Sequence, residues 1–211
     1  MNMETLKVFN EHRQETGVAS REEVHQKGLW HETFQCWFVS VEDGKPYVYL
    51  QKRSSTKQDF PNLFDITAAG HLLSHETLQD GVREVEEELG LYVSFDELYS
   101  GGIKIDPVTL GNFVDREFAH VFIYFCEKDI HDFTLQQEEV SGMIKVELSE
   151  FNQLWEEKVD QIKITGFVVD EEGKAEELDE SVGRDAFVPH SKEYYQEIIQ
   201  DMYDCLEEKW K

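Results

Sequence analysis

The chain contains the stretch Gly70-His-Leu-Leu-Ser-His-Glu-Thr-Leu-Gln-Asp-Gly-Val-Arg-Glu-Val-Glu-Glu-Glu-Leu-Gly-Leu91, which carries most of the information about its fold and chemistry. Residues three and four positions apart lie on one face of an α-helix, so Glu84, Glu87 and Glu88 share a face. Three carboxylates on one face repel one another, and a bound divalent cation relieves that repulsion. Mg2+ prefers such oxygen ligands and shares them with substrate phosphates. Because many glutamate runs are only solvated surface, the triplet alone leaves a metal site and an ordinary charged face as alternatives.

The residues around the acidic triplet predict a helix over residues 77–89. Val85 and Leu89 share a face beside the acidic one, and that face suits packing against a core. Gly90 follows at the position where a helix end favours a left-handed residue. The prediction is a helix with one apolar and one acidic face.

The same stretch resembles the Nudix box, whose pattern is G-x5-E-x7-R-E-U-x-E-E-x-G-U with U an apolar residue. Residues 70–76 match the first part of the pattern and residues 83–91 match the second. The spacer over residues 77–82 is one residue shorter than in the family, and Gly81 lies where the helix should start. We therefore expect a reshaped loop before the helix and leave the role of Glu76 open. The resemblance implies an α/β fold, a Nudix-type α/β/α sandwich with a mixed sheet.

Length and charge limit the range of functions. The chain has 211 residues and a formal net charge of −25, and this length suits one domain with an elaboration. The charge argues against binding of nucleic acid through its phosphate backbone and against anionic membrane surfaces. It does not argue against a phosphorylated substrate, because bound Mg2+ inverts the local charge. We expect a small-molecule diphosphate as the partner, and the sequence leaves open whether the chain forms a homodimer.

Cysteine usage and the lack of long apolar runs predict a cytoplasmic protein. Cys36, Cys126 and Cys205 are odd in number and widely spaced, which favours free reduced thiols over disulfides. The first residues lack the apolar run of a signal peptide. No segment approaches the roughly 18 apolar residues of a membrane-spanning helix.

Hydrophobic patterning predicts several further elements. Strands are expected over residues 33–41, 46–52, 93–105, 117–126 and 140–147. Asp43-Gly44 predicts the tight turn of a hairpin between the first two strands. Helices are expected over residues 3–14, 149–158 and 192–209, and the acidic segment 170–181 is expected to be a mobile loop. The apolar stripe on the last helix favours core packing over a partner site.

These elements fit one Nudix domain over residues 1–211. Its core is expected over about residues 30–160, with an extra N-terminal helix over about residues 3–14 and a C-terminal helical extension over about residues 185–211. The C-terminal extension carries no motif of the family.

The resemblance extends to the isopentenyl-diphosphate isomerase-like branch of the Nudix family. It covers residues 20–155 through stretches at 23–31, 50–65, 68–71 and 133–140. In the true isomerases, a cysteine that transfers a proton at the allylic carbon precedes the Gly-His pair, and here that position is Ala69. The isomerases also retain few of the box carboxylates, whereas this chain keeps all three. Both departures favour hydrolysis over isomerisation.

The resemblance also implies how a substrate is held. Arg53 and Lys57 match the basic pair that grips a diphosphate in the isomerases, and two ordinary surface cations are the alternative. Gly70, at the start of the box, is expected beside them at the substrate. Glu138 or Glu139 is a candidate distal base, because some Nudix enzymes use a glutamate from a late loop. A solvated loop is the alternative for these two residues.

A second metal site is implied by the isomerase-like branch. Asp115 and Glu117 alternate on one strand face and match the acid pair of the isomerase metal site, with one Glu changed to Asp. His25, His31 and His71 match the imidazoles of that site. Imidazole and carboxylate together suit a transition metal, and structural histidines are the alternative.

The leading hypothesis is hydrolysis, dependent on Mg2+ or Mn2+, of a diphosphate linked to another moiety. Glu84, Glu87 and Glu88 would hold the cation, which lowers the pKa of a bound water. Glu84 or Glu87 would accept the proton of that water, and Arg83 would orient the loop or the glutamates. The alternatives are an isopentenyl-diphosphate isomerase-like enzyme, which Ala69 disfavours, and a non-catalytic Nudix ligand-binding regulator, which the intact acids disfavour.

Overall fold

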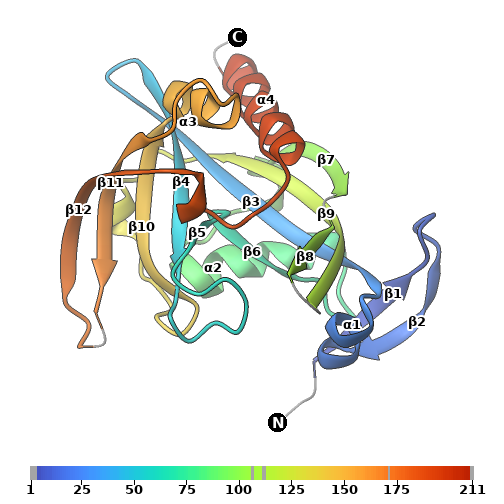
Figure 1. The fold of residues 1–211 in the computed structure, drawn as a ribbon. Coiled ribbons are helices and arrows are strands. Elements are labelled where there is room, and N and C mark those ends of the chain that lie inside the picture. The colour runs from blue at the N-terminus through green and yellow to red at the C-terminus, as the bar shows by residue number, and fades with distance from the viewer. Residues whose placement is uncertain (1–3, 106, 111–112, 171, 210–211) are drawn as a thin grey trace.

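The computed structural model describes residues 4–105, 107–110, 113–170 and 172–209. Its strands are β1 (Thr5–Phe9), β2 (Glu15–Ser20), β3 (Trp30–Glu42), β4 (Lys45–Arg53), β5 (Phe64–Asp65), β6 (Ala68–His71), β7 (Tyr99–Ile105), β8 (Val108–Leu110), β9 (Phe113–Phe125), β10 (Val140–Glu147), β11 (Ile162–Val169) and β12 (Ala175–Val182). Its helices are α1 (Arg21–Lys27), α2 (Arg83–Leu89), α3 (Leu148–Trp155) and α4 (Lys192–Lys209), with short 3-10 helices η1 (Leu78–Val82), η2 (Phe95–Glu97), η3 (Ile130–Asp132) and η4 (Arg184–Ala186). Figure 1 shows a twisted sheet with helices on both faces and the β1–β2 hairpin at one end.

Strand β3 is the centre of the sheet. The hydrogen-bonded order is β12-β11-β10-β4-β3-β1-β2, and β6 and β9 also pair with β3. β3 runs parallel to β9, whereas its pairings with β1, β4 and β6 are antiparallel. The mixed sheet expected from the sequence is therefore confirmed.

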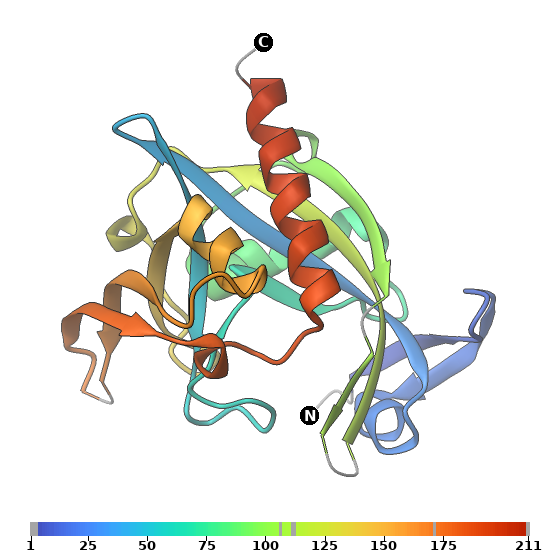
Figure 2. The same cartoon turned by 45° about the horizontal axis from the view of Figure 1, so that its top comes forward.

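Two hydrophobic layers cover the two faces of this sheet. Trp37 and Val39 of β3 pack in the layer under α3 and α4. Phe34, Cys36 and Phe38 of the same strand pack in the layer under α2. This alternation follows the period of two of a strand, and a strand that is buried on both faces reads as a continuous apolar run. Figure 2 shows α4 lying across the near face of the sheet, with α2 behind it, which confirms the layered α/β sandwich.

Several predicted elements are confirmed with their bounds or close to them. The strand over residues 140–147 and the helix over residues 192–209 are present as β10 and α4. In the β3–β4 hairpin, Asp43 and Gly44 have φ angles of 50° and 78°. Two left-handed residues in the turn match the right-handed twist of the flanking strands.

The N-terminal helix predicted over residues 3–14 is wrong for the described residues. β1 and β2 form an antiparallel hairpin there, and the helix of this region is α1, which follows it. Leu6 and Val8 are buried between more exposed neighbours, so the apolar positions have the period of a strand. The side-chain oxygen of Asn10 accepts hydrogen bonds from two backbone N–H groups of the turn, which stabilises a turn in place of a helix.

The helix predicted over residues 77–89 begins later than expected. The α-helix α2 starts at Arg83, and the 3-10 helix η1 precedes it. A Cβ atom at Gly81 would lie 2.8 Å from the Cβ of Phe34, so η1 packs closer to β3 than a larger residue would allow. Most residues of the short spacer thus form η1, which packs tightly on β3.

The mobile loop predicted over residues 170–181 is wrong over most of its length. Strand β12 pairs along its full length with β11, and Leu178 and Val182 are half-buried while most other side chains are exposed. Without β12, strand β11 would be the edge of the sheet, and its outer backbone N–H and C=O groups would have no strand to pair with. Strand β12 satisfies these groups with its own backbone. The chain beyond residue 160 therefore extends the sheet before it forms the predicted helix.

Two smaller expectations also change. The strand predicted over residues 93–105 begins only at Tyr99, because η2 occupies part of its first half. The helix predicted over residues 149–158 is α3, which starts at Leu148, and the hydroxyl of Ser149 donates to the side chain of Glu147, which precedes α3. Helix α3 ends at Trp155, three residues before the predicted end at residue 158.

The three cysteines are buried free thiols, as predicted. No helix in the described part of the chain combines the length and the apolarity that a membrane crossing requires.

Candidate active site

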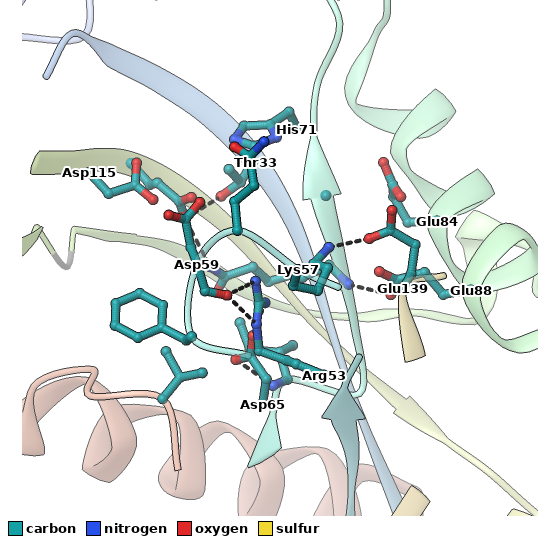
Figure 3. Close-up of a pocket in the computed structure, with 18 of the residues that line it drawn as sticks. Thr33, Arg53, Lys57, Asp59, Asp65, His71, Glu84, Glu88, Asp115 and Glu139 are labelled. Atoms are coloured by element: carbon teal, nitrogen blue, oxygen red, sulfur yellow. Dashed lines mark hydrogen bonds and ion pairs between the residues drawn. The ribbon is translucent and has the colours of Figure 1, made fainter. Parts of the chain in front are cut away.

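A polar cavity of about 570 Å3 lies beside the box helix α2. Its walls come from α2, strands β6 and β9, the loop at residues 56–60, residues 136–139 before β10, and the segment at residues 188–190 before α4. The cavity brings together most of the predicted site residues, namely His25, Arg53, Lys57, Gly70, His71, Arg83, Glu84, Glu87, Glu88, Asp115, Glu117, Glu138 and Glu139. Figure 3 shows how several of these side chains converge from different elements.

One glutamate of the box helix, Glu88, is buried at this cavity, and a second, Glu84, is mostly buried. The side chain of Glu84 is 13% exposed and Glu88 is 4% exposed, whereas the side chain of Glu87 is 54% exposed. Oε2 of Glu88 accepts hydrogen bonds from the backbone N–H of Ala69 at 3.1 Å and from Nε2 of Gln51 at 3.2 Å. The predicted acidic face therefore lies at the wall of a cavity and is not an ordinary solvated surface.

The electrostatics of the box suit a cation. Burial raises the pKa of Glu84 to about 7. Burial and the nearby charge of Glu84 raise the pKa of Glu88 to about 8. Carboxyl groups with such pKa values are costly to ionise without a positive partner. Hard oxygen donors at helical spacing fit Mg2+ or Mn2+.

Arg83 connects the parts of the box. Its Nε and Nη2 donate to the two carboxylate oxygens of Glu76 at 2.6 and 3.0 Å. Its Nη1 donates to Glu84 at 2.6 Å and to Glu87 at 3.0 Å, and Nη2 also donates to the carbonyl of His71. The short spacer thus still lets Glu76 reach Arg83, and this contact answers the question that the sequence left open. The geometry required for Arg83 to orient the glutamates is in place, and that role stays a prediction.

Gly70 sits where strand β6 faces the box helix. A Cβ atom at this position would lie 2.1 Å from Oε1 of Glu84. Any larger residue would therefore displace the Glu84 carboxylate from the strand. Gly70 lines the cavity, and the close approach to Glu84 gives it a physical role besides the predicted contact with substrate.

The predicted basic pair is engaged with acids in the cavity and does not form free surface charges. Arg53 donates from Nη1 to Oδ2 of Asp65 at 2.6 Å, and from Nε and Nη2 to the carbonyl of Asp59. Lys57 forms an ion pair with Glu139, one of the two candidate distal bases. Figure 3 shows Lys57 and Glu139 on the side of the cavity where Glu84 and Glu88 lie. The side chain of Glu138 is exposed.

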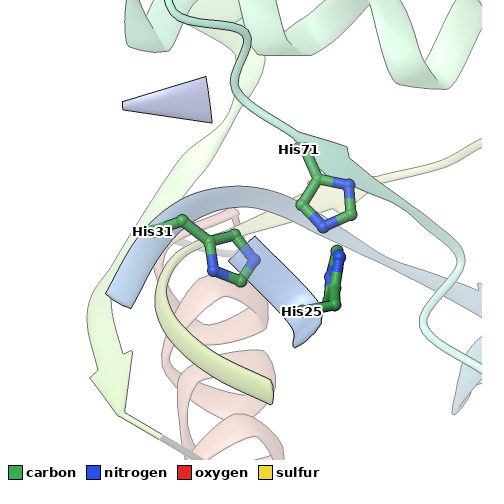
Figure 4. Close-up of side chains that lie close together, drawn as sticks. All are labelled: His25, His31 and His71. Carbon is green, nitrogen blue, oxygen red and sulfur yellow. The ribbon is translucent and has the colours of Figure 1, made fainter. Parts of the chain in front are cut away.

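The residues of the predicted second metal site also come together. The rings of His25, His31 and His71 have centroids 5.1 to 5.3 Å apart, as Figure 4 shows. One ligand atom from each of these three imidazoles lies within 4.8 Å of the others, and the same holds for His31, Asp115 and Glu117. We call these five residues the histidine cluster.

The donor atoms of the histidine cluster have the form that a metal requires. Nδ1 of His25 and Nδ1 of His31 each hydrogen-bond to a backbone carbonyl. Nε2 of each ring is therefore the nitrogen available to bind a metal. Nε2 of His31 and His71 and Oδ1 of Asp115 are buried and have no hydrogen-bond partner among the described residues. Burial lowers the pKa of His31 and of His71, so their imidazoles are neutral, as metal ligands are. Burial raises the pKa of Glu117 to about 8, and the charge of Asp115 adds to the shift.

Several residues that shape the cavity were not predicted. Asp65 holds Arg53, and Thr33 and Gln35 donate hydrogen bonds to Glu117. His190 enters from the segment before α4, and its Nε2 lies 3.5 Å from Oδ1 of Asp65. An acid beside a predicted basic pair was a usable signal for Asp65. The sequence offered none for His190, which belongs to an element without a family motif.

Comparisons with known proteins agree with this geometry. A family model described as the NUDIX domain matches residues 29–165. An uncharacterized Nudix hydrolase of Clostridium acetobutylicum is 40% identical over 204 residues, which cover 97% of this chain and 99% of that protein. Isopentenyl-diphosphate Delta-isomerase 2 of Photorhabdus laumondii is 29% identical over 127 residues, which cover 60% of this chain and 69% of that protein. A crystal structure of a Deinococcus radiodurans protein matches with a TM-score of 0.52 at 20% identity, over 71% of this chain and 86% of that one.

The chain therefore belongs to the Nudix family. Its likeness to a Nudix hydrolase over nearly its whole length places it among the hydrolases of that family. The lower identity to an isopentenyl-diphosphate isomerase agrees with the branch expected from the sequence.

Proposed function

We propose that this chain hydrolyses a diphosphate linked to another moiety, with Mg2+ or Mn2+ held by Glu84, Glu87 and Glu88. The observation that carries the proposal is the placement of the buried Glu88, the mostly buried Glu84 and the cations Arg53 and Lys57 in one cavity. A diphosphate needs positive partners for its oxygens, and a box cation together with this pair would supply them.

Different residues of the cavity have different roles in the proposed hydrolysis. When bound, a divalent cation neutralises the diphosphate and lowers the pKa of a bound water. Glu84 is the favoured base, because it is buried at the cavity with a pKa of about 7. Glu87, the other candidate, is more than half exposed. Arg83 orients both of these carboxylates through hydrogen bonds.

The remaining cavity residues bind the substrate. Arg53 and Lys57 contact the diphosphate, and Gly70 keeps the wall of β6 close to Glu84. Glu139 is a stronger candidate for a distal base than Glu138, because Glu139 is half-buried and paired with Lys57 in the cavity.

The isomerase alternative is opposed by Ala69. This residue lines the cavity where a proton-transferring thiol would stand, and its methyl group transfers no proton. We expect no dimethylallyl isomer when the protein is incubated with isopentenyl diphosphate. Appearance of that isomer at enzymatic rates would overturn the assignment. A non-catalytic regulator is disfavoured because a pure binder gains nothing from three repelling acids.

The histidine cluster is proposed as a second metal site. Three imidazoles with Asp115 and Glu117 form a donor set that suits a transition metal better than Mg2+. A transition-metal ion there would satisfy the buried lone pairs that have no hydrogen-bond partner among the described residues.

We also propose a cytoplasmic location and a small-molecule partner. Buried, unpaired cysteines fit a reducing compartment. The net charge of −25 disfavours nucleic acid and anionic membranes as partners.

A phosphate-release screen tests the proposed reaction. The substrates are nucleoside diphosphate sugars, dinucleotides, nucleoside triphosphates and prenyl diphosphates, each with Mg2+, with Mn2+ and with EDTA. We expect cation-dependent cleavage of at least one class in which a diphosphate joins two moieties. Cleavage that persists in EDTA, or no cleavage of any class, contradicts the proposal.

A further inference from the structure

The segment at residues 187–191 forms one wall of the cavity and is held firmly in place. Val188 and His190 of this segment line the cavity. The backbone N–H of Val188 donates to the carbonyl of Phe64 at 2.9 Å, and the hydroxyl of Tyr195 donates to the carbonyl of Val188 at 2.7 Å. Tyr195 is fully buried and stacks on a tryptophan of α3. The side chains of the segment therefore have fixed directions.

His190 lies against the acid that holds Arg53. Its Nε2 is 3.5 Å from Oδ1 of Asp65, and its ring stacks on Tyr194 with the centroids 4.6 Å apart. Oδ2 of the same carboxylate accepts the hydrogen bond from Arg53. Burial would raise the pKa of Asp65, but the close contact with the His190 imidazole and the charge of Arg53 hold that pKa well below its usual range. Asp65 therefore stays ionised between its two partners.

The first turn of α4 also reaches the histidine cluster. The hydroxyl of Tyr194 donates to Oε1 of Gln35 at 2.5 Å, and Nε2 of Gln35 donates to Glu117 at 3.2 Å. The C-terminal part of the chain thus contacts residues beside Arg53 and residues beside the histidine cluster, although it carries no motif of the family.

Arg53 has donors left for a ligand. Its hydrogen bonds to Asp65 and to the carbonyl of Asp59 use three guanidinium N–H groups, and a guanidinium has five. The remaining groups lie in the fixed plane of the guanidinium, so the orientation of that plane decides whether they meet phosphate oxygens. A guanidinium that is oriented in advance binds a diphosphate at lower entropic cost.

We propose that His190 is a positioning residue for the substrate diphosphate: it holds Asp65 in the orientation that directs the guanidinium of Arg53 into the cavity. The inference rests on the proposed diphosphate site and gives the C-terminal extension a function in it. It predicts that His190 acts on ligand binding through Arg53 and makes no independent contribution.

Binding of methylenediphosphonate in the presence of Mg2+, measured by titration calorimetry, tests this proposal. The variants are His190→Ala, Arg53→Lys and the double variant, with the exposed His12→Ala as the control. We expect His190→Ala to weaken binding about tenfold and His12→Ala to leave it unchanged. The double variant should bind no more than about twofold more weakly than Arg53→Lys, because residues that act through one group are not additive.

A second pair of variants separates positioning from packing. His190→Gln keeps a donor for Asp65 and should bind methylenediphosphonate within about threefold of the wild type. His190→Leu fills similar space without a donor and should lose as much affinity as His190→Ala. Equal affinity of the Gln and Leu variants would show that only packing matters, and this pair decides the question even if His190→Ala unfolds.

The remaining outcomes separate this inference from the proposed function. Additive losses in the double variant would mean that His190 contacts the ligand itself, and unchanged binding in His190→Ala would mean that it has no role; either result overturns the inference alone. If the wild-type protein binds no methylenediphosphonate with Mg2+, the proposed diphosphate site fails and the inference fails with it.

Discussion

The two candidate metal clusters line one cavity and differ in how the protein compensates their charge. In the box, Glu84 and Glu87 each accept a hydrogen bond from Arg83. In the histidine cluster, donor atoms of His31 and Asp115 are buried without a hydrogen-bond partner among the described residues. Glu84 and Glu87, which share this built-in counter-ion, tolerate the loss of a cation better than buried lone pairs without donors do. We therefore expect the box to bind its cation together with substrate and the histidine cluster to retain its ion.

The largest effect is expected from Glu88→Gln, which removes the charge of the most buried box acid. Gln keeps an oxygen that can accept the hydrogen bonds from Ala69 and Gln51. Turnover with Mg2+ should fall at least about a hundredfold, the scale of losing a key electrostatic group. The loss of turnover is measured by steady-state kinetics on a substrate identified in the phosphate-release screen.

Glu86→Gln is the matched control for this change. Glu86 lies on the same helix with its side chain exposed, so its removal should leave turnover within about twofold. Near-normal rates in Glu88→Gln, or equal losses in the two variants, would sink the assignment of the box as the catalytic cation site.

The next effect should separate the two clusters. His71→Ala removes one imidazole of the histidine cluster and should lower the affinity for Zn2+ or Mn2+ at that site at least about tenfold. Mg2+-dependent turnover should fall less than in Glu88→Gln. Metal analysis after equilibration with a chelator measures the affinity, and the exposed His75→Ala is the control. Unchanged Zn2+ retention in His71→Ala would leave the cluster as structural histidines.

A smaller effect is expected from Arg53→Ala, which acts on substrate rather than on either metal. KM should rise about tenfold with kcat nearly constant, as loss of binding shared by ground and transition states does. Because the variant leaves Asp65 buried without Arg53, the melting temperature and the Arg53→Ala/Asp65→Asn variant must be compared. If KM and kcat both stay unchanged, the pair Arg53–Lys57 is ordinary charge.

The smallest effect concerns the stability of the metal-free protein. Folding raises the pKa of Glu88 from 4.5 to about 8, so the unfolded chain loses this proton more readily and stability falls as the pH rises between these values. Glu88→Gln removes that penalty. In EDTA its melting temperature at pH 8 should exceed that of the wild type by about 2–4 °C for each 1 kcal/mol of this penalty, the scale for a chain of this size. The difference should shrink toward pH 5, and a difference independent of pH would contradict the burial argument.

The parts of the candidate site that could be predicted are those in which the regular geometry of a helix or strand fixes the directions of the side chains. Glu84 and Glu88 share a face because of the helical period, and Asp115 and Glu117 share one because of the period of a strand. These spacings hold whatever the rest of the chain does. The spacings therefore indicated the acidic face of each cluster, whereas the three histidines came only from the resemblance to the isomerases, and the contact of Glu76 was left open.

The rest of the fold depends on contacts between distant residues. The N-terminal segment has too few apolar residues to distinguish a hairpin from a helix. Leu6 and Val8 become a buried face only when β1 pairs with β2 and packs against Val24 of α1. Strand β12 exists because β11 is beside it. His190 reaches Asp65 only because the chain returns across the sheet, and no local pattern encodes that path.

Strand β12 also bears on how copies of this protein behave in concentrated solution. A free strand edge invites a second chain to add to the sheet, and proteins commonly block such edges with charge. The side chains of Glu176, Glu177, Asp179 and Glu180 are exposed on this edge strand. The β12 strands of two molecules repel each other, so the sheets of two copies do not pair edge to edge at low ionic strength. High salt screens that repulsion, and aggregation is expected to begin at this edge when salt or acid removes the charge.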